Sequence, residues 1–155
     1  MISGIAEGTA RPRKVLQSVG ALLAGLVANV ALSLGTDVGM RAMGILPALT
    51  QPATDPQLLL AAVYRTVYGV VSSYIVARLA PNRPMEHALL GGAIGMALGI
   101  VGAVVTWNRE LGPHWYSVAL IVTALPSAWL GGQLRVLQVR KREVQLMFAE
   151  QEDIR

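Results

Sequence analysis

Four apolar stretches, each about 20 residues long, occupy most of this chain and constrain its fold more than any other feature. A hydrocarbon core about 30 Å thick is crossed by roughly 20 residues of α-helix, so each stretch is long enough to span a bilayer. The stretches contain a single charged residue, Arg65. The sequence therefore predicts an all-α polytopic membrane protein, an antiparallel bundle of four transmembrane helices at Val15–Leu34, Leu58–Ala77, Ala88–Trp107 and Trp115–Leu134.

Composition indicates the same class. Only 14% of the 155 residues are charged, against about 25% in soluble domains, and the mean hydropathy is +0.51. We interpret the net charge of +4 as an orientation signal rather than a nucleic-acid surface, because no basic patch is interleaved with aromatic residues. Cysteine is absent, which excludes disulfides, thiolate metal ligands and cysteine nucleophiles.

Basic residues flank the apolar stretches unequally. If the stretches alternate in direction, only Arg41 and Arg109 fall on one side of the membrane. Since loops rich in Lys and Arg are retained in the cytoplasm, we expect both termini to be cytoplasmic and the chain to be a multi-pass protein of the inner membrane. The nine basic residues on the cytoplasmic side are Arg11, Arg13, Lys14, Arg78, Arg83, Arg135, Arg140, Lys141 and Arg142.

Two tails flank the membrane domain of residues 15–134. Residues 1–14 form an N-terminal tail, predicted to be disordered over Met1–Ala10, and its basic end resembles that of a signal peptide. The apolar stretch that follows is longer than the roughly 7–15 residues of a cleavable signal, so we expect a retained helix. Residues 135–155 predict an amphipathic cytoplasmic helix, basic and then acidic, which serves as a stop-transfer segment or as a docking helix for a partner.

Proline residues mark the predicted ends of the helices. Thr36–Leu46 either continues the first helix beyond the membrane or lies along its surface. Asp55-Pro56 predicts an N-cap followed by a proline in the first helical position of the second helix. Pro81–Pro84 predicts a tight turn between the second and third helices, and Pro126 predicts a kink in the fourth.

Small residues in the last two stretches predict close helix packing. Gly91, Gly95 and Gly99 recur every four residues on the third helix, and Ala128 and Gly132 do so on the fourth. Helices in lipid associate through van der Waals packing, so faces of small residues are contact faces. Two interpretations stay open: a contact within the monomer, or the seam of a homo-oligomer.

Arg65 predicts a polar cluster near the outer end of the bundle. A helical side chain leans toward the N-terminus of its helix, which takes the guanidinium of Arg65 outward to Asp37 at the end of the first helix. Asp37 is also one turn from Arg41, and Tyr68 lies on nearly the same face as Arg65. We expect these four residues to cluster, with Asn29 below them, either as a structural ion pair or as a site for an anion or polar headgroup.

No signature of catalysis or of a cofactor is present. His87 and His114 fall on opposite membrane faces under the predicted topology, so they cannot share a metal ion. HExxH, GxSxG and a pair of intramembrane aspartates are all missing. We therefore expect no enzyme activity, no bound metal and no cofactor.

Residues 77–95 read ARLAPNRPMEHALLGGAIG, and WY at 115–116 is followed by LPSAWLGG at 125–132. These motifs resemble small uncharacterised inner-membrane proteins of bacteria with four spans and no assigned activity. The resemblance covers the second to fourth stretches and implies membrane class and location only.

Two functions agree with the sequence, and in both the chain is embedded in the lipid bilayer. We favour a non-enzymatic accessory or structural component that packs against partners, in a homo-oligomer or a larger membrane complex. The alternative is a small transporter or channel in which Arg65 and Asp37 line an outward-facing polar cavity. The two differ in whether Arg65 faces a cavity or is sealed by neighbouring helices.

Overall fold

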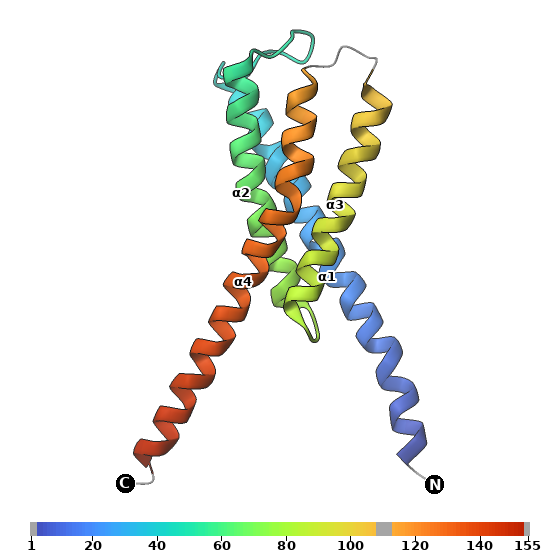
Figure 1. The fold of residues 1–155 in the computed structure, drawn as a ribbon, viewed down its shortest axis with the longest axis vertical. Helices are drawn as coiled ribbons and strands as arrows, with labels where there is room; N and C mark the ends of the chain where they lie inside the picture. The colour runs from blue at the N-terminus through green and yellow to red at the C-terminus, as the bar shows by residue number, and fades with distance from the viewer. Residues whose placement is uncertain (1–2, 108–112, 154–155) are drawn as a thin grey trace.

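The computed structural model describes residues 3–107 and 113–153, and within them the side chains of residues 14–107 and 113–151. Figure 1 shows the four helices formed by this part of the chain. Each contains a segment that is long and apolar enough to cross a membrane, which confirms the predicted all-α class and makes the chain a multi-pass membrane protein by length and composition. The helices are α1 (Ser3–Ala42), α2 (Asp55–Leu79), α3 (Pro84–Thr106) and α4 (His114–Asp153).

Successive helices run antiparallel, so the bundle has two distinct ends (Figure 1). We call one the long-loop end, where residues 43–54 join α1 to α2 and where α3 and α4 meet. The other is the turn end, where residues 80–83 join α2 to α3. At the turn end α1 and α4 both extend past the bundle, so the two termini lie on the same side (Figure 1).

The helices form an open ring rather than a closed bundle. α2 packs on α1, α3 and α4, and α4 packs on α3, whereas no described residues of α1 and α4 are neighbours. α1 and α3 meet near the turn end, where Gly91 faces Leu22, and diverge toward the long-loop end (Figure 1). The contact between α1 and α3 is therefore the smallest among the packed helix pairs.

Helix α1 is longer at both ends than the first apolar stretch. It begins at Ser3, so the disorder predicted for Met1–Ala10 is wrong from Ser3 onward, and residues 1–2 lie outside the described part of the chain. An established helix gains one hydrogen bond for each residue added, which lets it continue into a polar segment. At the other end α1 continues to Ala42, so the helical alternative for Thr36–Leu46 holds for most of that segment. Gly44 then reverses the chain with a φ of 73°, a left-handed conformation that favours glycine.

The start of α2 differs by one residue from the prediction. Thr54, not Asp55, is the N-cap, because Thr54 is extended while Asp55 is already helical. The side-chain oxygen of Gln57, three residues on, accepts hydrogen bonds from the backbone nitrogen of Thr54 at 2.9 Å and from its hydroxyl at 3.0 Å. Gln57 Nε2 also donates to the carbonyl of Ile45 at 2.8 Å, which ties the 43–54 connection to the helix start.

Replacing Gln57 by alanine is expected to lower the free energy of unfolding by about 1 kcal/mol, the usual effect of losing a helix cap. Because Gln57 also holds the connection, the loss should be local. Hydrogen exchange would show faster exchange of the Thr54 amide and its neighbours, with the amides of α3 unchanged. Equal protection in Q57A and the parent chain would contradict the capping role.

Pro126 lies inside α4, which remains helical from His114 to Asp153 and changes direction near its middle (Figure 1). Two hydroxyls near the proline are bonded to their own helix: Thr123 donates to the carbonyl of Ala119 at 2.8 Å, and Ser127 to that of Thr123 at 2.7 Å. Both bonds satisfy the hydroxyls within α4, and neither reaches the carbonyl of Val122, whose helical partner Pro126 removes. The remainder of α4 is the helix predicted for the segment after residue 134, and its side chains from Arg140 to Gln151 are all exposed.

Candidate functional site

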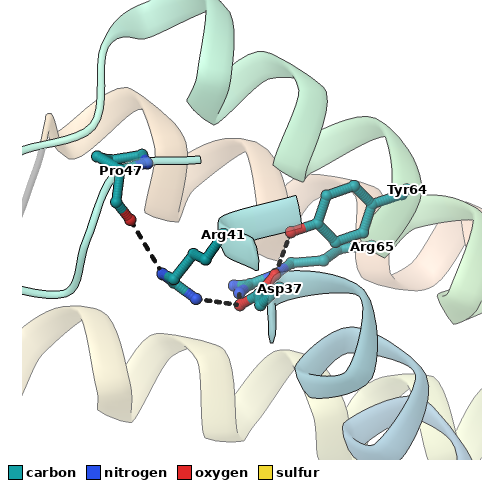
Figure 2. A network of polar contacts seen from close by, with 5 residues as sticks. All are labelled: Asp37, Arg41, Pro47, Tyr64 and Arg65. Carbon is teal, nitrogen blue, oxygen red and sulfur yellow. Dashed lines mark hydrogen bonds and ion pairs between the residues drawn. The ribbon is translucent and has the colours of Figure 1, made fainter. Parts of the chain in front are cut away.

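Asp37 is the centre of a polar cluster near the long-loop end, shown in Figure 2. Its Oδ2 accepts a hydrogen bond from Nη2 of Arg65 at 2.7 Å, and its Oδ1 accepts one from the hydroxyl of Tyr64. Arg41, one helical turn after Asp37, places Nη1 3.9 Å from the same Oδ2. Asp37 is only 6% exposed, so this carboxylate is held almost wholly by protein groups.

Two helices and a loop build the cluster. Asp37 and Arg41 share a face of α1 because they are four residues apart. Arg65 comes from α2, whose antiparallel course brings it alongside the end of α1. Arg41 also donates from Nε to the carbonyl of Pro47 at 3.2 Å, which anchors the 43–54 connection over the cluster (Figure 2).

The structure brings three of the four predicted cluster residues together on one carboxylate. Tyr68, the fourth, lies one turn along α2 from Tyr64 and instead shares a hydrogen bond of 2.7 Å with Thr36. Sequence reasoning missed the role of Tyr64, although it precedes Arg65 directly. It also missed Tyr116 of α4, whose ring centroid lies 5.9 Å from the guanidinium carbon of Arg65. Neither contact had a signal in the spacing, since both depend on how the helices cross.

The cluster carries an excess of one positive charge, because two arginines face one aspartate. Arg65 is also left with hydrogen-bonding capacity: its Nε is buried and has no partner among the described residues. An unpaired buried donor costs about 1–3 kcal/mol, and more when it is charged. The buried Nε is closed to a ligand in this structure, so the excess positive charge and the exposed part of the Arg65 side chain are what favour a further negatively charged group.

A cavity of about 520 Å³ lies against Arg65 and is lined by all four helices. On α1 it runs from Leu22 to Leu34, and on α2 from Arg65 to Val76. Asn29 lies midway along this wall, and its Oδ1 is buried with no partner among the described residues. Arg65 keeps about one-third of its side chain exposed, 32%, so it faces this space instead of being sealed by its neighbours.

Most hydroxyl groups of the cavity wall are already satisfied. Thr66 donates to the carbonyl of Ala62 at 2.7 Å and Ser72 to that of Gly69 at 3.0 Å. Thr123 and Ser127 bond to α4 in the same way. Because these groups are used within their own helices, much of the polar wall has no need of water.

The predicted small-residue faces divide between packing and cavity. Ala128 packs directly on Gly92, and Gly99 lies close to Ile121, so these residues hold α3 against α4. Gly95 has no neighbour within 4 Å in the direction of a side chain and lines the cavity. The structure therefore places only part of the Gly91, Gly95 and Gly99 face in a close contact, because α3 leans away from α1 beyond Gly91.

The closest helix approaches lie at the turn end. A methyl group on Gly131 would come within 2.5 Å of the carbonyl oxygen of Val70, and one on Gly132 within 2.7 Å of the sulfur of Met85. Gly131 thus packs on α2, a contact that the sequence did not indicate, while Gly132 packs on α3. Together with the contact of Gly91 and Leu22, these approaches bring all four helices close together at the turn end.

Among the residues that the structure describes, no three His, Cys, Asp or Glu side chains are grouped as metal ligands would be. The two histidines lie at opposite ends of the bundle. His87 Nε2 is 2.9 Å from the hydroxyl of Ser18, and His114 Nε2 is 3.2 Å from the carbonyl of Trp107. Comparison with known protein families, with curated proteins and with solved structures gives no match for this chain.

Proposed function

We propose that this chain is a small membrane-embedded transporter that binds an anionic ligand in the cavity between its four helices. Arg65 is the anion-binding residue. The observation that carries this proposal is the position of Arg65, which lines the cavity, stays one-third exposed at 32% and belongs to a cluster with one more positive than negative charge.

The close helix contacts at the turn end favour a carrier over an open channel. The turn end is closed by the close contacts of Gly92 with Ala128 and of Gly132 with Ala88. A continuous pore would need a path through that contact region. The excess of basic residues beside the turn end supports an orientation in which this end faces the cytoplasm and the cavity faces outward, with both termini cytoplasmic.

A second candidate is the accessory role that the sequence favours. The observation in its favour is the part of α4 that extends past the bundle, where Leu146, Met147 and Phe148 are 61–69% exposed. Exposed apolar side chains on a protruding helix are typical of a surface that binds a partner. In that role the cavity would be filled and Arg65 would serve only to join α1 to α2.

The absence of cysteine offers a direct test. Ser33 lines the cavity, whereas Leu32, the residue before it, does not and is 39% exposed on the outside of the bundle. We expect S33C to react with a membrane-impermeant thiosulfonate on the delipidated protein in non-ionic detergent, where no lipid fills the cavity, and L32C, on the detergent-covered outside, to remain unmodified, because a thiol ionises only where water reaches it. An S33C as inert as L32C would overturn the transporter proposal and favour the accessory role.

A further inference from the structure

We propose that the ligand of this cavity is a lipid with an anionic headgroup, which enters sideways from the bilayer between α1 and α3. This inference rests on the proposed function and specifies its substrate class. Three independent features carry it: where the cavity opens, how its polar groups are distributed, and how long it is.

The cavity opens toward lipid. Its α1 and α3 walls include large apolar side chains that keep a large accessible area, such as Leu23 at 55%, Leu34 at 58% and Ile94 at 42%. We place the mouth of the cavity between the two helices that carry these accessible apolar side chains. Since α1 and α3 are in contact near Gly91 and diverge toward the long-loop end (Figure 1), a mouth between them lies on the lipid-facing side of the membrane domain.

The charged residue of the cavity wall, Arg65, lies at the long-loop end of the cavity. The charged cluster is near the long-loop end, and Asn29 is midway along α1. Toward the turn end the wall consists mainly of Leu22, Leu26, Val76 and small residues; its hydroxyls are those of Ser72 and Ser127, which are bonded to their own helices, and that of Ser73. A water-soluble anion would leave this apolar half empty or wet, whereas an acyl chain fills it at no cost in hydrogen bonds.

The length and charge of the cavity also fit a lipid of one leaflet. From Arg65 to Val76 is eleven residues of helix, or about 16 Å, roughly half of a 30 Å hydrocarbon core. A lipid of the leaflet at the long-loop end would place its headgroup at the cluster and its chain toward Gly91. Because the cluster of Asp37, Arg41 and Arg65 has an excess of one positive charge, it favours a headgroup whose negative charge is not cancelled by an ammonium group.

The test is lipid competition on the full-length chain, purified and delipidated in a non-ionic detergent. An equimolar mixture of phosphatidylglycerol and phosphatidylcholine with identical acyl chains is added, and bound lipid is counted by native mass spectrometry. We expect one site with about a five- to tenfold preference for phosphatidylglycerol, the size expected for one partly buried cation. R65Q should remove the preference, and glycerol 3-phosphate, which has the charged phosphate without chains, should not compete.

A pair of glycine variants makes the test independent of the ion pair. Gly95 and Gly102 both lie on α3 with no neighbour within 4 Å in the direction of a side chain, but only Gly95 lines the cavity. We expect G95F to block the mouth and remove the phosphatidylglycerol preference, while G102F keeps it. This comparison holds even if R65Q fails to fold, because neither phenylalanine touches the cluster.

The remaining outcomes separate this inference from the proposed function. If G95F and G102F lose the phosphatidylglycerol preference equally, or if neither loses it, the lipid binds around the basic tail instead of in the cavity. Either result would overturn the lipid inference. Effective competition by glycerol 3-phosphate would also overturn it, in favour of a soluble anion, while the transporter proposal stands. An unreactive S33C in the labelling experiment would remove the transporter proposal itself.

Discussion

Replacing Asp37 by leucine is expected to lower the free energy of unfolding by about 3 kcal/mol, the lower end of the range for breaking a buried ion pair. Asp37 is the only carboxylate that pairs with Arg65 in the described structure, and its loss leaves the guanidinium without a counter-ion inside the membrane domain. The tyrosine hydroxyl of residue 64 also loses its acceptor. SDS-driven unfolding in mixed micelles, followed by tryptophan fluorescence, would measure the change.

A second carboxylate provides the matched control. Glu86 pairs with Arg83 at 3.1 Å, but both side chains are more than 60% exposed, at 64% and 73%. The same substitution there, E86L, is expected to cost less than about 1 kcal/mol, because exposed ion pairs contribute little. The double variant D37L/R65L should recover most of the loss of D37L, since it removes both charges. Equal effects of D37L and E86L would contradict the view that the cluster is a buried pair.

Replacing Gly131 by alanine is expected to lower the free energy of unfolding by about 1–3 kcal/mol, as overpacking does in a tightly packed core. The added methyl group would come within 2.5 Å of the carbonyl oxygen of Val70 and 2.7 Å of the backbone nitrogen of Tyr74. Backbone atoms of α2 cannot turn aside as a flexible side chain can, so α2 and α4 must move apart. SDS-driven unfolding would measure this change as well. Moving the two helices apart should also break the hydrogen bond between Tyr74 and Gln138, which is 2.7 Å long in the parent chain.

Gly95 is the control for this effect. It is also a helical glycine, but a methyl group there meets nothing within 4 Å. G95A is expected to leave stability unchanged or raise it by up to about 1 kcal/mol, because alanine is the better helix former. A G131A variant that is as stable as G95A would show that the contact between α2 and α4 can open without cost.

The sequence predicted the helices well and their ends less well. Runs of apolar residues long enough for a bilayer identify all four helices, since a chain in hydrocarbon must satisfy its backbone hydrogen bonds within each segment. The exact helix ends depend on which residues cap the helix or reverse the chain, and the hydropathy pattern does not resolve this. Thr54 caps α2 because Gln57 can reach back to it, and α1 continues to Ala42 because Gly44 supplies the reversal.

The candidate site was predictable in part. Asp37 and Arg65 are opposite charges at similar depth on sequential antiparallel helices, and a single intramembrane charge has few partners to choose from. Tyr64 and Tyr116 could not be assigned from the sequence, because which aromatic side chain reaches the cluster depends on the rotation of each helix about its axis. The prediction that the whole glycine face of α3 is a packing contact was wrong for the same reason. Gly91 is in contact, but Gly95 lines the cavity because α3 diverges from α1.

The sequence by itself determined that this chain forms four membrane-length helices, and it marked Arg65 as the one charge within their apolar stretches. The reason is that helix formation in lipid is a local matter of hydropathy and length. Only the tertiary structure decided that α1 stays apart from α4 and leaves a cavity beside Arg65. That outcome depends on how the helices cross. Gly131 lets α4 approach α2 closely, whereas α3 has no close contact of this kind with α1 toward the long-loop end.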